Sequence, residues 1–298
     1  MFKNVIMYRI APGWGSTAEE VEARLQDNHF VECGASQEKS LGWLEPRGEA
    51  NGPLLEVVAG QWILKLMTET RALPASVVNR KTQERVAQIE TSTGRKPGKK
   101  ETRDLKDDIR LELLPMAFTK QSSTLVWIDR EAQLLVMDAG SQARADELVT
   151  LLVQSLPGLA LSLVNTQVSP SAAMAGWLVT QEAPQGFSVD RECELKAADE
   201  SKAVVRYARH RLDTEEVKQH IEGGKMPTRL ALTWDDRVSF VLTEGLQLKK
   251  MAFLDVVFEG ASSGKDDGFD ADVAISTGEL QKVLPDLLLA LGGEMPSA

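Results

Sequence analysis

Residues 74–115 constrain the fold of this chain most, because they carry a helical pattern that is broken once by a tight turn. A first helix begins at Pro74, a residue suited to the first helical turn, and runs to about Ile89. Pro97-Gly98 then forces a turn before a second helix over about 101–114. The pattern predicts a helical hairpin, which we call the tip.

Strand patterns flank the tip on both sides. Before it, apolar residues alternate at 2–10 and recur at 54–59 and 62–68. After it, strand patterns return at 123–129 and 133–138. The arrangement predicts an α+β fold with two sheet-containing regions, in which the tip is inserted into the first.

The second region repeats this mixture of helices and strands. We expect a central body of 1–73 with 116–165, the tip at 74–115, and a base domain at 166–298. Residues 165–176 are rich in small side chains and mark a boundary or a short helix. Further strands are predicted at 203–208, 228–234, 237–243, 246–253 and 272–276, and further helices at 17–28, 141–156, 214–222 and 278–291, the last bent near Pro285.

Positive charge is concentrated at the turn of the tip, although the formal net charge of the chain is -10. An acidic protein with one dense basic segment is expected to bind a polyanion there. The alternative is a solvated protrusion, because Glu101, Asp104, Asp107 and Asp108 offset several cations. The candidate phosphate-binding residues are Arg95, Lys96, Lys99, Lys100 and Arg103.

The composition excludes several classes of protein. The 298 residues include only two cysteines, Cys33 and Cys193, so neither a disulfide framework nor a Cys-rich zinc site is expected. The first residues lack the pattern of a signal peptide, and no window approaches about 20 apolar residues. We expect a soluble protein of the reducing cytosol.

One nuclease-like set of residues occurs in the chain. Asp190 precedes Glu194 and Lys196, and such carboxylates could hold a metal while the lysine steadies the attacking water. The alternative is a charge cluster on a helix surface. His29, His210 and His220 fit no catalytic motif and are expected to be surface or capping residues. We expect no catalytic residue.

Two other segments resemble ligand sites only superficially. Residues 260–265 are one residue short of a phosphate loop, and Asp266 follows where a magnesium-binding hydroxyl is needed. Asp266, Asp267, Asp270 and Asp272 do not follow a calcium-loop order and are expected to form a solvated acidic loop. We therefore expect neither a metal nor a cofactor. The six tryptophans are expected to anchor cores.

Short strings along the whole chain resemble the bacterial recombination-associated RdgC family. Each string is weak alone, but their order and spacing are specific. They include Phe2-Lys3-Asn4, Tyr8-Arg9, Gly42-Trp43, the basic 94–101, Leu113-Leu114-Pro115, Ala117-Phe118, Trp127-Ile128-Asp129, Gln185-Gly186-Phe187, His220-Ile221-Glu222, Leu230-Ala231-Leu232, Phe269-Asp270-Ala271-Asp272 and Gly292-Gly293-Glu294.

The resemblance implies a DNA-binding protein that is not an enzyme and associates with the nucleoid. It implies horseshoe-shaped subunits that close into a ring-shaped homodimer around duplex DNA and restrain the RecA recombinase. A compact chain of this length would have a radius of gyration of about 19 Å, which leaves no hole for a duplex. Encirclement would need two open subunits that meet at two different contacts.

The same resemblance implies where the subunits meet. Phe118 matches an aromatic position at one dimer contact, and Arg209-His210 matches a polar pair at the other. Met116 replaces the usual arginine of the family, so a charge contribution there is in doubt. The alternative for Phe118 is an ordinary phenylalanine of the core. The alternative for Arg209 and His210 is simple exposure at the end of a strand. Besides duplex binding, two function classes stay open, namely a metal-dependent nuclease and a protein-interaction scaffold.

Overall fold

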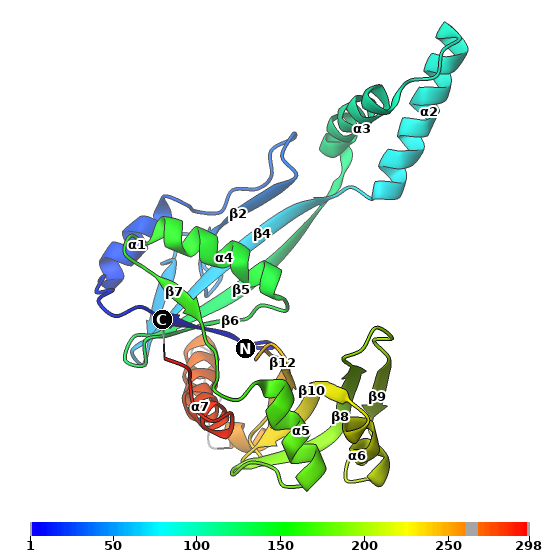
Figure 1. Ribbon diagram of the computed structural model, residues 1–298. Coiled ribbons are helices and arrows are strands. Elements are labelled where there is room, and N and C mark those ends of the chain that lie inside the picture. The colour runs from blue at the N-terminus through cyan, green and yellow to red at the C-terminus, as the bar shows by residue number, and fades with distance from the viewer. Residues whose placement is uncertain (1, 260–267, 297–298) are drawn as a thin grey trace. The chain divides into compact units, whose positions relative to one another are not determined.

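The computed structural model describes residues 2–259 and 268–296. Among these residues the chain forms seven α-helices and two antiparallel sheets (Figure 1). The predicted α+β class with two sheet-containing regions is confirmed.

The first sheet has seven strands in the order β2-β4-β5-β6-β1-β7, and β3 pairs with β4. Strand β6 is wholly apolar, and all four of its residues are buried. The strands are β1 (Ile6–Ile10), β2 (Lys39–Leu44), β3 (Leu55–Val58), β4 (Gln61–Ala72), β5 (Phe118–Asp129), β6 (Leu134–Met137) and β7 (Leu161–Leu163).

The second sheet has five strands in the order β12-β11-β10-β8-β9. Its last three strands follow one another in sequence and pair as neighbours, so the predicted meander is confirmed. The strands are β8 (Phe187–Ala197), β9 (Val204–Ala208), β10 (Lys225–Trp234), β11 (Val238–Thr243) and β12 (Leu248–Phe253).

The helices follow the sequence pattern closely except at the C-terminal end. In Figure 1, α5 and α6 lie beside the second sheet, and both contact β10. The helices are α1 (Ala18–Gln26), α2 (Ala75–Thr93), α3 (Lys99–Leu113), α4 (Gln142–Ser155), α5 (Pro170–Thr180), α6 (Glu215–Glu222) and α7 (Gly268–Ala290).

Contacts between Cα atoms divide the chain into two compact units. The second unit consists of Leu25–Leu44 and Lys65–Thr124 and contains α2 and α3. The remaining segments, Met1–Arg24, Glu45–Leu64 and Leu125–Ala298, form the first unit. The finer division into body, tip and base stays a prediction.

Helix α7 is the centre of the first unit's core. Its buried side chains belong to one hydrophobic cluster together with residues of both sheets and of α5. Burial of each large apolar side chain contributes about 1.5 to 3 kcal/mol. From α7 the cluster includes Val273, Leu280, Val283, Leu284 and Leu287. It also includes Trp127 of the first sheet, Phe2 just before that sheet begins, Leu230, Leu232 and Phe240 of the second sheet, and Met174 of α5.

Polar contacts also join α7 to both sheets. The indole of Trp234 donates to Asp286 at 2.9 Å, and the amide of Gln281 donates to Asp129 at 2.7 Å. Glu279 is buried and receives two bonds of 2.7 Å from Arg237. The hydrogen bonds from Arg237 lower the pKa of Glu279, so this helix carries a fixed negative charge inside the unit.

The predicted strand at 272–276 is wrong, because these residues belong to α7. Val273, Ser276, Thr277 and Leu280 are buried at helical spacing. The hydroxyl of Thr277 donates to the Val273 carbonyl at 2.8 Å, which is a bond within one helical turn. The helix continues through Pro285 to Ala290.

The helix surface considered for Asp190 and Glu194 is also wrong, because both residues lie on β8. This strand pairs with β10 through two register shifts and with β9 through Glu192–Lys196. The residues of β8 alternate between apolar and polar from Phe187 to Ala197 except at Arg191, so the sequence carried a strand signal that the prediction missed. Strand β2 had no sequence prediction either.

Four of the six tryptophans are core anchors as predicted. Trp43, Trp62, Trp127 and Trp234 are buried. Trp14 and Trp177 are partly exposed. The expectation therefore holds for the tryptophans on strands and not for those in the loop before α1 and on α5.

Within the second unit, α2 and α3 contact each other and lie side by side (Figure 1). Gly94 follows α2 in a left-handed conformation, with φ 69°, and its N–H bonds to the Glu90 carbonyl. Arg85 of α2 pairs with Glu112 of α3 at 3.2 Å. Glycine is suited to position 94 because it adopts a positive φ without a steric penalty.

We predict that Gly42→Ala destabilises the protein by about 1 to 3 kcal/mol or more, because the new methyl group would overpack β2. A Cβ atom on Gly42 would lie 2.6 Å from the backbone nitrogen of Phe30. Gly176→Ala is the matched control, since its Cβ meets nothing within 4 Å inside α5. The control should gain roughly 0.5 to 1 kcal/mol. Urea denaturation measures both changes, and equal stability of the two variants would contradict the prediction.

Candidate nucleic-acid interface

The five predicted phosphate-binding residues lie together at the turn between α2 and α3. Arg95 and Lys96 occupy the connecting segment after Gly94, while Lys99, Lys100 and Arg103 lie in the first turns of α3. All five side chains are exposed. The structure therefore brings them to one end of the two helices.

Most of these cations form no salt bridge within the described residues. Arg95 pairs with Glu101 at 2.9 Å. Among residues 2–259 and 268–296, no salt bridge is formed by Lys96, Lys99, Lys100 or Arg103. This contrasts with α2, where Glu84 lies within 4 Å of both Arg80 and Lys81.

The start of α3 adds to the positive potential of this cluster. The N-terminal end of a helix carries a partial positive charge, so cations in the first turn are unfavourable and anions are favourable. The first turn of α3 holds Lys99 and Lys100 against a single acid, Glu101, and Gly98 provides no side-chain cap. An anion bound at this end would relieve the repulsion between the two lysines and the positive end of the helix.

Arg71 fixes the segment that leads from α3 into β5. Its guanidinium donates to the carbonyls of Leu114 and Ala117 at 3.3 and 3.4 Å. It also donates to the carbonyls of Cys33 and Gly34 at 3.1 and 3.3 Å. Four backbone acceptors on two segments thus meet one side chain of β4, and no motif in the sequence pointed to this role.

Glu69 supports the same region from β4. Its carboxylate accepts hydrogen bonds from the Gln121 amide at 2.6 Å and from the backbone N–H of Cys33 at 3.0 Å. The bond from Gln121 is the main reason that the pKa of Glu69 lies below its usual value, followed by the bonds from Cys33 and the charge of Arg71. A charged Glu69 therefore holds β5 against the 33–34 segment.

Phe118 begins β5 and is 87% exposed. It is therefore not part of the hydrophobic core. Met116 and Leu111 are also exposed, at 72% and 59%. Three large apolar side chains within eight residues form an apolar surface next to the end of α3, which is unusual for a solvated helix pair and typical of a contact surface.

Arg209 and His210 directly follow β9 and are exposed. Arg209 has a positive φ of 56°, and the backbone N–H of His210 donates to the Arg191 carbonyl at 3.1 Å. The His210 ring lies 5.6 Å from the Tyr207 ring. The pair belongs to the first unit, whereas Phe118 belongs to the second.

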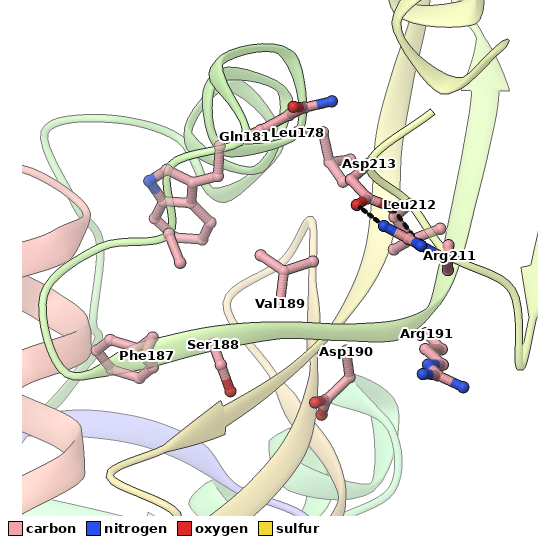
Figure 2. Close-up of a pocket in the computed structure, with 12 residues that line it drawn as sticks. Leu178, Gln181, Phe187, Ser188, Val189, Asp190, Arg191, Arg211, Leu212 and Asp213 are labelled. Atoms are coloured by element: carbon pink, nitrogen blue, oxygen red, sulfur yellow. Dashed lines mark hydrogen bonds and ion pairs between the residues drawn. The ribbon is translucent and has the colours of Figure 1, made fainter. Parts of the chain in front are cut away.

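The nuclease-like residues do not form a shared carboxylate site. Asp190 accepts the Thr233 hydroxyl at 2.9 Å, and its side chain points away from Val189 in Figure 2. Glu194 pairs with Arg206 at 2.6 Å and accepts the Thr228 hydroxyl at 2.8 Å. The bond from Arg206 is the main cause of a lowered pKa of Glu194.

Figure 2 shows the cavity beside this part of β8, which has a volume of about 530 Å³. Val189 points into it between α5 and the segment after β9, and the rim carries an ion pair between Arg211 and Asp213. Asp190 is oriented away from Val189. The carboxylates that line the cavity are Asp190 and Asp213, and Asp213 is paired with Arg211, so the lining does not supply the set of free carboxylates that metal-dependent hydrolysis uses.

The described parts of the chain show no grouping of three or more His, Cys, Asp or Glu side chains suited to a metal ion. The phosphate-loop-like segment 260–265 and Asp266 and Asp267 lie outside the described residues. Asp270 and Asp272 lie in α7 and not in a loop, and Asp270 pairs with Arg47 at 2.5 Å. The predicted acidic loop is therefore wrong for these two aspartates.

Both cysteines are buried and unpaired with each other. Burial raises the pKa of Cys193 to about 12, so its thiol stays protonated at neutral pH. Burial also raises the pKa of Cys33, and the charge of Glu69 adds to the shift. Within the described residues, no helix combines the length and apolar character needed to cross a bilayer.

Comparison with known proteins identifies the family. The family model described as "Putative exonuclease, RdgC" matches residues 1–294. The chain belongs to the RdgC family. The recombination-associated protein RdgC of Dechloromonas aromatica is 45% identical over 303 residues, covering 100% of this chain and 99% of that protein. Its counterpart in Cupriavidus pinatubonensis is 47% identical over 296 residues, covering 98% of each chain. RdgC proteins therefore match this chain over its whole length, as the short strings predicted.

Proposed function

We propose that this protein binds duplex DNA without sequence preference and acts in homologous recombination as a ring-shaped homodimer. The observation that carries the proposal is the exposed, largely unpaired cation cluster at the start of α3, in a chain with net charge -10. The names of the relatives, recombination-associated proteins, give the biological process.

The chemistry of the cluster favours contacts to phosphate over contacts to bases. Lysine and arginine side chains on an exposed turn neutralise backbone charge, but they present no ordered set of donors and acceptors to base edges. An otherwise acidic surface repels DNA elsewhere, so binding is confined to the basic surface. The proposed ligand is therefore the DNA backbone.

Closure into a ring gives such weak individual contacts a long lifetime on DNA. Two identical subunits close a ring when each offers two different self-complementary surfaces. Phe118 with its apolar neighbours supplies one surface, and Arg209 with His210 supplies the other. A bound ring occupies duplex that RecA would otherwise use, and this restrains recombination in the nucleoid without catalysis.

We predict that binding of a random duplex weakens steeply with salt and that Lys99→Ala/Lys100→Ala reduces this dependence. Each lost phosphate contact lowers the log-log slope by about 0.9. Titrations of a labelled duplex at several salt concentrations measure the slope.

Arg80→Ala/Lys81→Ala is the matched control, because it removes two cations of α2 that already lie near Glu84. The control should keep a slope close to that of the unmodified protein. A slope near zero for the unmodified protein would contradict duplex binding, whereas equal slopes for both variants would remove the tip from the interface.

We predict that Phe118→Ala raises the dimer dissociation constant roughly thirtyfold, the effect expected when about 2 kcal/mol of an interface hot spot is lost. The subunit should keep its stability, because the side chain is 87% exposed. Sedimentation velocity across protein concentrations measures the change. Leu289→Ala, at a residue of α7 that is 76% exposed, is the control. An unmodified protein that is monomeric at micromolar concentration would contradict the ring.

The description of the matching family model favours an exonuclease as the second candidate function. We predict that purified protein with Mg²⁺ or Mn²⁺ leaves end-labelled linear duplex intact. Degradation that is lost in both Asp190→Asn and Glu194→Gln would establish the nuclease instead. Degradation that persists unchanged in both variants would indicate a contaminating enzyme. Failure of the protein to retard duplex at low salt would favour the scaffold class.

A further inference from the structure

A second set of cations lies on one face of the five-stranded sheet. Arg229 of β10 stands directly between Glu194 of β8 and Thr243 of β11, and Glu194 is opposite Arg206 of β9. Directly opposed residues of neighbouring strands project to the same face of a sheet. These four residues therefore form one polar row across four strands.

Two lysines extend this row on the same face. Lys196 is two residues from Glu194 along β8, and side chains two residues apart point the same way. Lys249 of β12 is opposite Val241, which is two residues from Thr243 along β11. We call Lys196, Arg229 and Lys249 the sheet cluster.

The sheet cluster lines a cavity of about 300 Å³ together with Thr228, Thr243 and Gln247. Two carboxylates, Glu194 and Glu244, also line it. The floor of the cavity thus combines cations with hydroxyl and amide groups, which are the groups that commonly bind phosphate oxygens.

The carboxylates do not cancel the charge of the sheet cluster. Glu194 is paired with Arg206 at 2.6 Å, and Arg206 is outside the cluster. None of the three cluster side chains forms a salt bridge with any residue in the described ranges, 2–259 and 268–296. The charge of Arg229 also acts on Glu194, so Glu194 is shared between Arg206 and Arg229. Two carboxylates therefore face the three cations of the cluster and Arg206, and the cavity keeps an excess of positive charge in an acidic protein.

The spacing of the cluster favours a chain of anions over a single small one. β8 and β12 are separated by β10 and β11, so Lys196 and Lys249 stand on strands about 14 Å apart. Duplex DNA carries one charge per about 1.7 Å along its axis. A stretch of DNA backbone therefore offers phosphates to all three cations, which one inorganic ion cannot do.

We propose that the sheet cluster is a second phosphate-contact surface for the DNA backbone, separate in sequence and in compact unit from the basic tip. The inference rests on the proposed duplex binding. It adds a contact surface to the first unit, whereas the tip cations belong to the second. It also predicts no sequence preference, because every contact is to phosphate.

The test compares Arg229→Ala/Lys249→Ala with a control variant that also loses one arginine and one lysine, at positions outside the cavity. Arg24→Ala/Lys218→Ala is the control, since these residues lie on α1 and α6 in the same compact unit and outside the cavity. Full-length proteins are titrated with labelled random duplex at several salt concentrations. Thermal midpoints and sedimentation establish that both variants keep the fold and the oligomeric state.

The cluster variant should bind duplex roughly thirtyfold more weakly at 0.15 M salt and lose about 1.8 from the log-log slope, the effect of two lost phosphate contacts. The control should stay within about twofold of the unmodified protein. Equal weakening of both variants would overturn the inference, because it would reflect net charge alone.

Two further outcomes separate this inference from the function on which it rests. Loss of binding in the tip variant Lys99→Ala/Lys100→Ala, with none in the cluster variant, would overturn the second surface and leave duplex binding intact. No duplex binding by the unmodified protein would overturn both. Thermal stabilisation by submillimolar inorganic phosphate that is lost in the cluster variant would overturn the backbone assignment in favour of a small anion.

Discussion

The burial of α7 is the constraint on which the first unit depends. Side chains from this one helix complete the hydrophobic cluster that also contains residues of both sheets. Each sheet would otherwise expose an apolar face to water, at a cost of about 25 cal/mol for every Å². Glu279, Gln281 and Asp286 add polar contacts to Arg237, Asp129 and Trp234. The helix therefore holds in place the second sheet, which carries the sheet cluster and the carboxylates of β8.

Electrostatic pairing then determines which cations remain available to a ligand. Some cations form a salt bridge, as Arg85 of α2 does with Glu112 of α3 and Lys250 of β12 does with Glu192 of β8. At the start of α3 and on the second sheet, several cations form no salt bridge among the described residues. Positive potential in this acidic chain is therefore local, and local potential guides a polyanion to defined surfaces.

Much of the fold was predictable because its signals are local. Helical periodicity with Pro74 and Gly94 predicted α2 and its end, and turn residues predicted the β10-β11-β12 meander. The prediction failed where packing overrides local preference. The strand expected at 272–276 is helical because Val273, Ser276 and Thr277 pack at helical spacing in a core made by both sheets. β8 was missed although its apolar and polar residues alternate from Phe187 to Ala197, with an exception at Arg191.

The sequence by itself determined the family, the α+β class and the concentration of positive charge at 95–103, since each depends on residue identity and order. Only the tertiary structure decided which charges are paired and which apolar side chains are exposed. Phe118 is exposed in a segment held by Arg71, and Arg229 meets Glu194 and Thr243 only through strand pairing. Contacts between residues far apart in sequence make these differences, and no local pattern encodes them.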